Sequence, residues 1–117
     1  MFIFPSALEN RGEAIAKGWA GSLTMGAGQF CTNPGVAVLL AGEKANTFSR
    51  VASEALSQVP AQTMLTDGIA TAYLSGQQRI AGAKGVRELL TTSCEMRNAT
   101  PHLYSVTAAD WLANEEL

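Results

Sequence analysis

The chain has 117 residues, which is enough for one domain with a modest core. Hydrophobic residues make up 47% and charged residues 15%, which is a globular composition and not a disordered one. The net charge of −2, with no cluster of Lys and Arg, argues against a nucleic-acid-binding surface. No apolar run is long enough to cross a bilayer, and no signal-peptide pattern opens the chain. Cys31, Cys94 and a single His offer no zinc-ligand pair and no disulfide framework, so we expect no metal and a reducing, cytoplasmic setting.

The first part of the chain predicts a strand followed by a long helix. A short strand is expected at 2–5, ended by the proline. Ser6 and Glu9 form a capping-box pattern, in which the Ser6 hydroxyl accepts from the Glu9 amide, so the helix is expected to begin there. Glycines at 26 and 28 are expected to end it. Its apolar positions recur at spacings of seven, four and four, which indicates one buried face: Leu8, Ile15, Trp19 and Leu23.

A second strand and two more helices are expected next. The run 36–40 is continuously apolar, as in a strand buried on both faces of a parallel sheet. Helical spacing resumes over 44–58 and stops at Pro60. The core side of this helix is predicted to hold Phe48, Val51, Ala52, Ala55 and Val59. Thr66 or Asp67 is expected to cap a third helix, whose inward residues would be Ile69, Ala72, Tyr73 and Ile80.

The last part of the chain predicts two strands, 86–91 and 102–106, and a short helix capped by Thr107. Trp19 and Trp111 are expected in the core. Strands that alternate with helices of this length indicate an α/β fold, with a mostly parallel sheet and flanking helices.

The segment 28–35 is a tight turn that carries one thiol between the long helix and the apolar run 36–40. Its sequence is Gly28-Gln29-Phe30-Cys31-Thr32-Asn33-Pro34-Gly35. Glycine permits unusual dihedral angles and proline fixes φ, so the backbone around the thiol is closely specified. Cys31 is therefore a candidate nucleophile. The alternative is a buried and inert cysteine, because free Cys is among the most buried residue types and no basic residue lies within a dozen positions.

This turn resembles the cysteine signature of a known enzyme family. The pattern Gly28-Gln29-x-Cys31 is similar to that of the NAD(P)-dependent aldehyde dehydrogenases. The whole of 28–35, and more loosely the opening segment 2–8, resembles one branch, the 2,5-dioxovalerate (α-ketoglutarate semialdehyde) dehydrogenases. Two residues depart from the general pattern: Thr24 replaces an aromatic or aliphatic residue, and Gly26 stands where glycine is uncommon.

The resemblance implies a fold and a reaction. Residues 1–117 would be a single fragment of the cysteine-bearing catalytic domain, without the cofactor-binding domain and inactive alone. Cys31 would attack a small aldehyde and offer its backbone N–H to the oxyanion, and Phe30 and Thr32 would line the substrate tunnel. For Phe30 the alternative is packing in the core. NADP or NAD would be bound by parts of the enzyme outside this chain, and the complete enzyme would be a homo-oligomer.

Two rival functions stay open at this point. The first is a non-catalytic α/β binding or structural module in which Cys31 is inert. The second is a hydrolase with a Cys31/His102 dyad, which requires the imidazole within hydrogen-bond reach of the sulfur. A lone His on a strand is more commonly a packed or surface residue.

Overall fold

The computed structural model describes residues 1–93, 95–114 and 117. Cys94 lies outside the described residues. The chain divides into two compact units, Met1–Val59 and Pro60–Leu117. The first unit contains β1 (Phe2–Ile3), α1 (Pro5–Thr24), β2 (Val38–Leu39) and α2 (Glu43–Ser57). The second contains β3 (Gln62–Thr63), α3 (Asp67–Gly82), β4 (Arg87–Leu90), β5 (Asn98–Ala99), β6 (Leu103–Ser105) and α4 (Ala108–Ala113).

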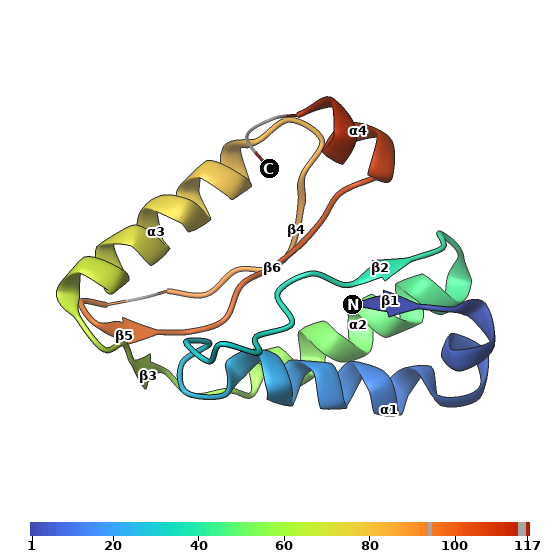
Figure 1. The fold of residues 1–117 in the computed structure, drawn as a ribbon, viewed down its shortest axis with the longest axis horizontal. Helices are drawn as coiled ribbons and strands as arrows, with labels where there is room; N and C mark the ends of the chain where they lie inside the picture. The colour runs from blue at the N-terminus through green and yellow to red at the C-terminus, as the bar shows by residue number, and fades with distance from the viewer. Residues whose placement is uncertain (94, 115–116) are drawn as a thin grey trace. The chain divides into compact units, whose positions relative to one another are not determined.

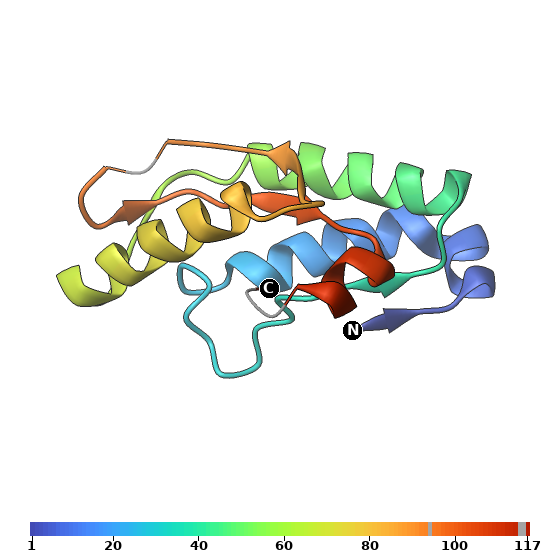
Figure 2. The ribbon, with the colours of Figure 1, turned by 90° about the horizontal axis from the view of Figure 1, so that it is seen from above.

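The core of the first unit lies between α1 and α2, which run side by side in both views (Figures 1 and 2). Small residues at this interface, Ala16, Ala20 and Ala52, are almost completely buried, so the two helix backbones can approach closely. Larger apolar side chains fill the rest of the interface and are also buried: Leu8, Trp19, Phe48, Val51 and Leu56. The predicted apolar face of the second helix is therefore largely confirmed.

The α1 helix begins differently from the expectation. Its N-cap is Phe4, its first residue is Pro5, and no side chain caps its N-terminus. Proline suits the first helical position because its missing N–H would have no helical partner there and its φ is already helical. The predicted capping box of Ser6 and Glu9 is wrong for this reason. Arg11 interrupts the helix with a φ of −151° and a ψ of 25°.

The strand predicted over 36–40 is shorter and more exposed than expected. Only Val38 and Leu39 pair, in parallel with Phe2 and Ile3. Leu40 is 69% exposed, and Val36 and Val38 are also exposed. Among the described residues this segment is therefore not buried on both faces, and a continuous apolar run did not by itself establish burial.

The α/β class is confirmed, but the described strands do not form the mostly parallel sheet that was expected. They form three separate pairs: β1 with β2 is parallel, whereas β3 with β5 and β4 with β6 are antiparallel. A parallel pair needs a long crossover, which is usually a helix. The described part of the connection from β4 to β6 contains β5 and no helix, which is consistent with antiparallel pairing.

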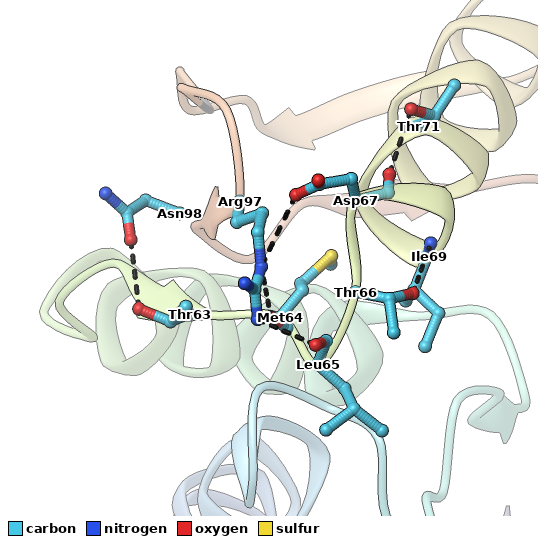
Figure 3. A network of polar contacts seen from close by, with 9 residues as sticks. All are labelled: Thr63, Met64, Leu65, Thr66, Asp67, Ile69, Thr71, Arg97 and Asn98. Carbon is cyan, nitrogen blue, oxygen red and sulfur yellow. Dashed lines mark hydrogen bonds and ion pairs between the residues drawn. The ribbon is translucent and has the colours of Figure 1, made fainter.

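The start of α3 is held by polar contacts that Figure 3 shows from close by. Thr66 is the N-cap, as predicted, and its hydroxyl accepts from the backbone N–H of Ile69 at 3.2 Å. The guanidinium of Arg97 donates to the carbonyl oxygens of Met64 and Leu65, at 2.6 Å and 2.7 Å from Nη2. Its Nε also lies 3.6 Å from Asp67 Oδ1. Arg97 therefore ties the segment before β5 to the chain that enters α3.

The buried face of α3 differs from the prediction. Ala70 is buried, whereas Ile69 and Ala72 are exposed. Trp111 in α4 is 42% exposed, so its predicted place in the core is wrong within the described residues. Thr107 does cap α4, because its hydroxyl accepts from the Asp110 N–H at 3.1 Å.

The packing between α1 and α2 makes Leu56 a sensitive position. Leu56 is fully buried, so Leu56→Ala should lower the free energy of unfolding by about 2–5 kcal/mol through lost contacts and a residual cavity. The matched control, Leu40→Ala, removes the same atoms from an exposed site and should change it by less than about 0.5 kcal/mol. Urea unfolding followed by circular dichroism measures both. Equal losses would contradict the described core.

Candidate functional site

The thiol-bearing turn begins where α1 ends, and Figure 2 shows it as the loop that leads from α1 to β2. Three successive residues have positive φ: 59° at Gly26, 56° at Ala27 and 72° at Gly28. Two hydrogen bonds, from Gly28 N–H to the Met25 carbonyl and from Gln29 N–H to the Gly26 carbonyl, are both 3.1 Å long. The Gln29 side chain donates to the Gly26 carbonyl as well, at 3.1 Å, so both the backbone and the side chain of Gln29 bond within the turn.

Cys31 is an exposed, free thiol. It is the second residue of a short turn closed by the hydrogen bond from the Asn33 N–H to the Phe30 carbonyl, at 3.0 Å. No backbone hydrogen bond among the described residues uses the Cys31 N–H. The exposed thiol differs from the buried cysteine that an inert module would have. The turn thus presents a sulfur atom and an uncommitted N–H donor at the same residue.

The two residues that flank the thiol are also exposed. Phe30 is 53% exposed, so it is not packed in the core of the described chain. Its ring instead lies over the backbone of Gly26, where an added Cβ would stand 3.3 Å from Phe30 Cδ2. Thr32 is exposed on the other side of Cys31. Their proposed contact with an aldehyde stays a prediction.

Two side chains connect the turn to α1. The amide nitrogen of Asn33 donates to the carbonyls of Leu23 and Gly28, at 2.8 Å and 2.9 Å. The indole N–H of Trp19 donates to the Pro34 carbonyl at 2.7 Å. Sequence reasoning assigned Asn33 no role and Trp19 only a core position. The known tendency of Asn side chains to bond nearby backbone in turns was the signal available for Asn33.

Thr24, which departs from the family pattern, also has a local function. Its hydroxyl donates to the Ala20 carbonyl at 2.9 Å, in the last turn of α1. The same hydroxyl lies 3.4 Å from the carbonyl of Gly21, which is the first of the last four carbonyls of α1 and lacks a helical partner. The Thr24 hydroxyl thus bonds back into the helix. The backbone N–H groups of Gly28 and Gln29 bond instead to the carbonyls of Met25 and Gly26, which follow the helix.

His102 lies in the second unit, whereas Cys31 lies in the first. Burial lowers the pKa of His102 below its usual value because desolvation disfavours the charged imidazole, and the carboxylate of Glu88 opposes this shift. The rings of Tyr73 and Tyr104 lie 5.9 Å and 6.3 Å from the imidazole, centroid to centroid. His102 is therefore a packed residue that is neutral near pH 7, and the Cys31/His102 dyad stays a prediction.

No group of three or more His, Cys, Asp and Glu side chains in the described ranges could hold a metal ion. Among the same residues, no helix combines the length and apolar character needed to cross a membrane.

Replacing glycine by alanine should have opposite effects on stability at Gly28, which has a positive φ, and at Gly18, which lies in the helix. Gly28→Ala should lower the free energy of unfolding by roughly 1–2 kcal/mol, because φ is +72° and the new Cβ would approach the Leu23 carbonyl at 3.3 Å. Gly18 lies inside α1, and a Cβ added there would meet no other atom within 4 Å, so Gly18→Ala should raise the free energy of unfolding by roughly 0.5–1 kcal/mol. Thermal and urea unfolding measure both changes. A stabilising Gly28→Ala would show that the turn is not left-handed at this residue.

Comparison with known proteins gives the site its context. No protein-family model matches the chain. A protein of Azospirillum brasilense named alpha-ketoglutaric semialdehyde dehydrogenase 2 is 46% identical over 116 residues, which cover 95% of this chain and 22% of that protein. The alpha-ketoglutaric semialdehyde dehydrogenase of Acinetobacter baylyi is 27% identical over 106 residues, which cover 89% of this chain and 20% of that protein.

These matches bear on the resemblance found in the Cys31 turn. The chain spans about a fifth of the length of both relatives, so the identity concerns one segment of each. Nearly the whole of this chain takes part in the match, the Cys31 turn included. The resemblance predicted from the sequence is confirmed: this chain is homologous to one segment of each of two proteins that are named alpha-ketoglutaric semialdehyde dehydrogenase.

Proposed function

We propose that this chain supplies the nucleophile of an NAD(P)-dependent aldehyde dehydrogenase that oxidises α-ketoglutarate semialdehyde (2,5-dioxovalerate) to 2-oxoglutarate. The observation that carries the proposal is the exposed thiol of Cys31, whose own backbone N–H makes no backbone hydrogen bond to any other described residue. The names of the two relatives support the substrate and the reaction.

In the first step the Cys31 thiolate adds to the aldehyde carbon. A C–S bond forms, and the carbonyl π electrons move to the oxygen, which becomes an oxyanion. A thiol suits this step because it is strongly nucleophilic and ionises more easily than an alcohol. The Cys31 N–H donates to the oxyanion, where a preorganised donor stabilises the developing charge.

The adduct becomes the Cys31 thioester when the former aldehyde carbon loses a hydride, and this oxidation would require a hydride acceptor, NAD or NADP. None of the described strand-to-helix connections has the three-glycine turn that holds a dinucleotide phosphate, and in this proposal the cofactor is bound by parts of the enzyme outside this chain. We therefore assign that step, the second oxyanion donor and the general base to no residue described here.

In the last step water attacks the Cys31 thioester. The C–S bond breaks, the carboxylate leaves and the thiolate returns to its starting state. Phe30 and Thr32 flank the sulfur and would contact the aldehyde as it approaches. In this proposal residues 1–117 are one part of the cysteine-bearing domain of a cytoplasmic homo-oligomer, in which a mostly parallel sheet would be completed, and the isolated chain is inactive.

A segment exchange tests the proposal. The matching segment of the Azospirillum brasilense relative is replaced by this chain, and formation of reduced nicotinamide is followed with α-ketoglutarate semialdehyde. In this hybrid Cys31→Ala should lower kcat by at least about 1,000-fold, because no other group on the turn can form the thioester. Cys94→Ala, which removes the other cysteine and leaves the sequence of the turn 28–35 unchanged, is the matched control and should retain activity.

Two outcomes would contradict the proposal. Retained activity in Cys31→Ala would remove the nucleophile assignment. A folded hybrid with intact Cys31 that reduces neither NAD nor NADP with any aldehyde tried would remove the enzyme assignment and favour the binding module.

A further inference from the structure

The hydrogen bonds around the turn assign a role to a residue that had none. We propose that Asn33, supported by Trp19, is a positioning residue that fixes the backbone at Cys31 for attack on the aldehyde. This inference rests on the proposed function, because it takes Cys31 as the nucleophile and its N–H as an oxyanion donor.

Asn33 follows Cys31 in the turn, and its side chain bonds to two residues that precede Cys31, Leu23 and Gly28. Leu23 is in the last turn of α1, where carbonyl oxygens have no helical donor, and Gly28 lies three residues before Cys31. The single Nδ2 group of Asn33 donates to both carbonyls, at 2.8 Å and 2.9 Å. Its own backbone N–H closes the turn that contains Cys31. Residues on both sides of Cys31 are thereby tied to the end of α1.

The chemistry of these contacts requires an amide at position 33. Two carbonyl acceptors need two donor hydrogens on one short, planar side chain. Asparagine provides them, aspartate provides none when ionised, and serine provides one. Gly28 leaves room for this arrangement, since a Cβ there would stand 3.4 Å from Asn33 Nδ2 and 3.3 Å from the Leu23 carbonyl.

Trp19 holds the far side of the same turn. Its side chain is buried between α1 and α2, with the ring 5.8 Å from that of Phe48. Its indole N–H donates to the Pro34 carbonyl at 2.7 Å, one residue beyond Asn33. The turn is therefore anchored to a packed core and not only to itself. Because the turn is anchored, the Cys31 N–H needs little reorganisation to donate to the oxyanion when charge develops on the substrate.

Asn33→Asp in the segment hybrid tests the inference by the split between kcat and KM. The exchange keeps the shape of the side chain and removes both donors, so kcat should fall by about 10- to 100-fold, the effect of moving a reacting group by on the order of 1 Å. KM should stay within about threefold, because a positioning residue acts through Cys31 and not through a contact of its own with the aldehyde. Asn33→Ser keeps one donor and should lose less kcat than Asn33→Asp.

Asn10→Asp is the matched control. The Asn10 amide donates to the Ser6 carbonyl at 2.7 Å near the other end of α1, so the same exchange removes the same kind of bond away from the turn. It should leave kcat unchanged. An unchanged kcat in Asn33→Asp, or an equal loss in Asn10→Asp, would overturn the inference.

A second readout separates this inference from the proposed function. In ¹⁵N NMR spectra of the 117-residue chain, Asn33→Asp should shift and broaden the Cys31 amide and its neighbours over 28–34, while Asn10→Asp should not. If the parent hybrid is inactive but these NMR changes occur, the proposed function fails and the positioning of Cys31 stands. Unchanged amides over 28–34 overturn the positioning even if the hybrid is active. If circular dichroism shows that the Asn33→Asp variant is unfolded, the same NMR spectra and kinetics are measured on Asn33→Ser.

Discussion

The hydrogen bond from the Trp19 indole to the Pro34 carbonyl connects the core of the first unit to its thiol-bearing turn. The indole is buried because α1 and α2 pack through small residues, and a buried N–H is costly unless it finds an acceptor. Pro34 supplies that acceptor. The requirement to satisfy one buried donor therefore also places the segment that contains Cys31.

The turn itself depends on residues that tolerate left-handed backbone. Gly26 and Gly28 adopt positive φ with little penalty, whereas Ala27 between them adopts a φ of 56° at some cost. The hydrogen bonds of Asn33 to Leu23, which precedes this segment, and to Gly28, its last residue, offset that cost. The result is an exposed sulfur on a backbone with several independent anchors. An enzyme nucleophile needs this combination, since it must be accessible and yet fixed.

The sequence predicted the features that depend on local pattern. Phe48 and Val51 lie on the core side of α2 because apolar residues at helical spacing must face a partner, and Thr66 and Thr107 cap helices because their hydroxyls accept backbone N–H groups. The start of α1 was predicted less well. There a proline at the first helical position made the Ser6 cap unnecessary.

Features that depend on distant partners were not predictable in this way. The two-residue strands β3 and β5 exist only because they pair with each other across more than thirty positions, and neither has a recognisable pattern of its own. The exposure of Leu40 and Trp111 depends in the same way on what packs against them. In the candidate site, the motif predicted Cys31 as the nucleophile, and the structure describes its thiol as exposed. The contacts of Asn33 with Leu23 and Gly28 could not be predicted, because a side chain that bonds to the backbone leaves no periodic pattern in the sequence.

The most direct test of this account is the alkylation rate of Cys31 by iodoacetamide. It is measured on the chain with Cys94→Ser, which leaves Cys31 as the single thiol, before and after unfolding in urea. An exposed thiol on the surface turn predicts native and unfolded rates within about tenfold of each other at the same pH. Alkylation that occurs only after unfolding would contradict the account, because it would show that Cys31 is the buried, inert cysteine of a non-catalytic module.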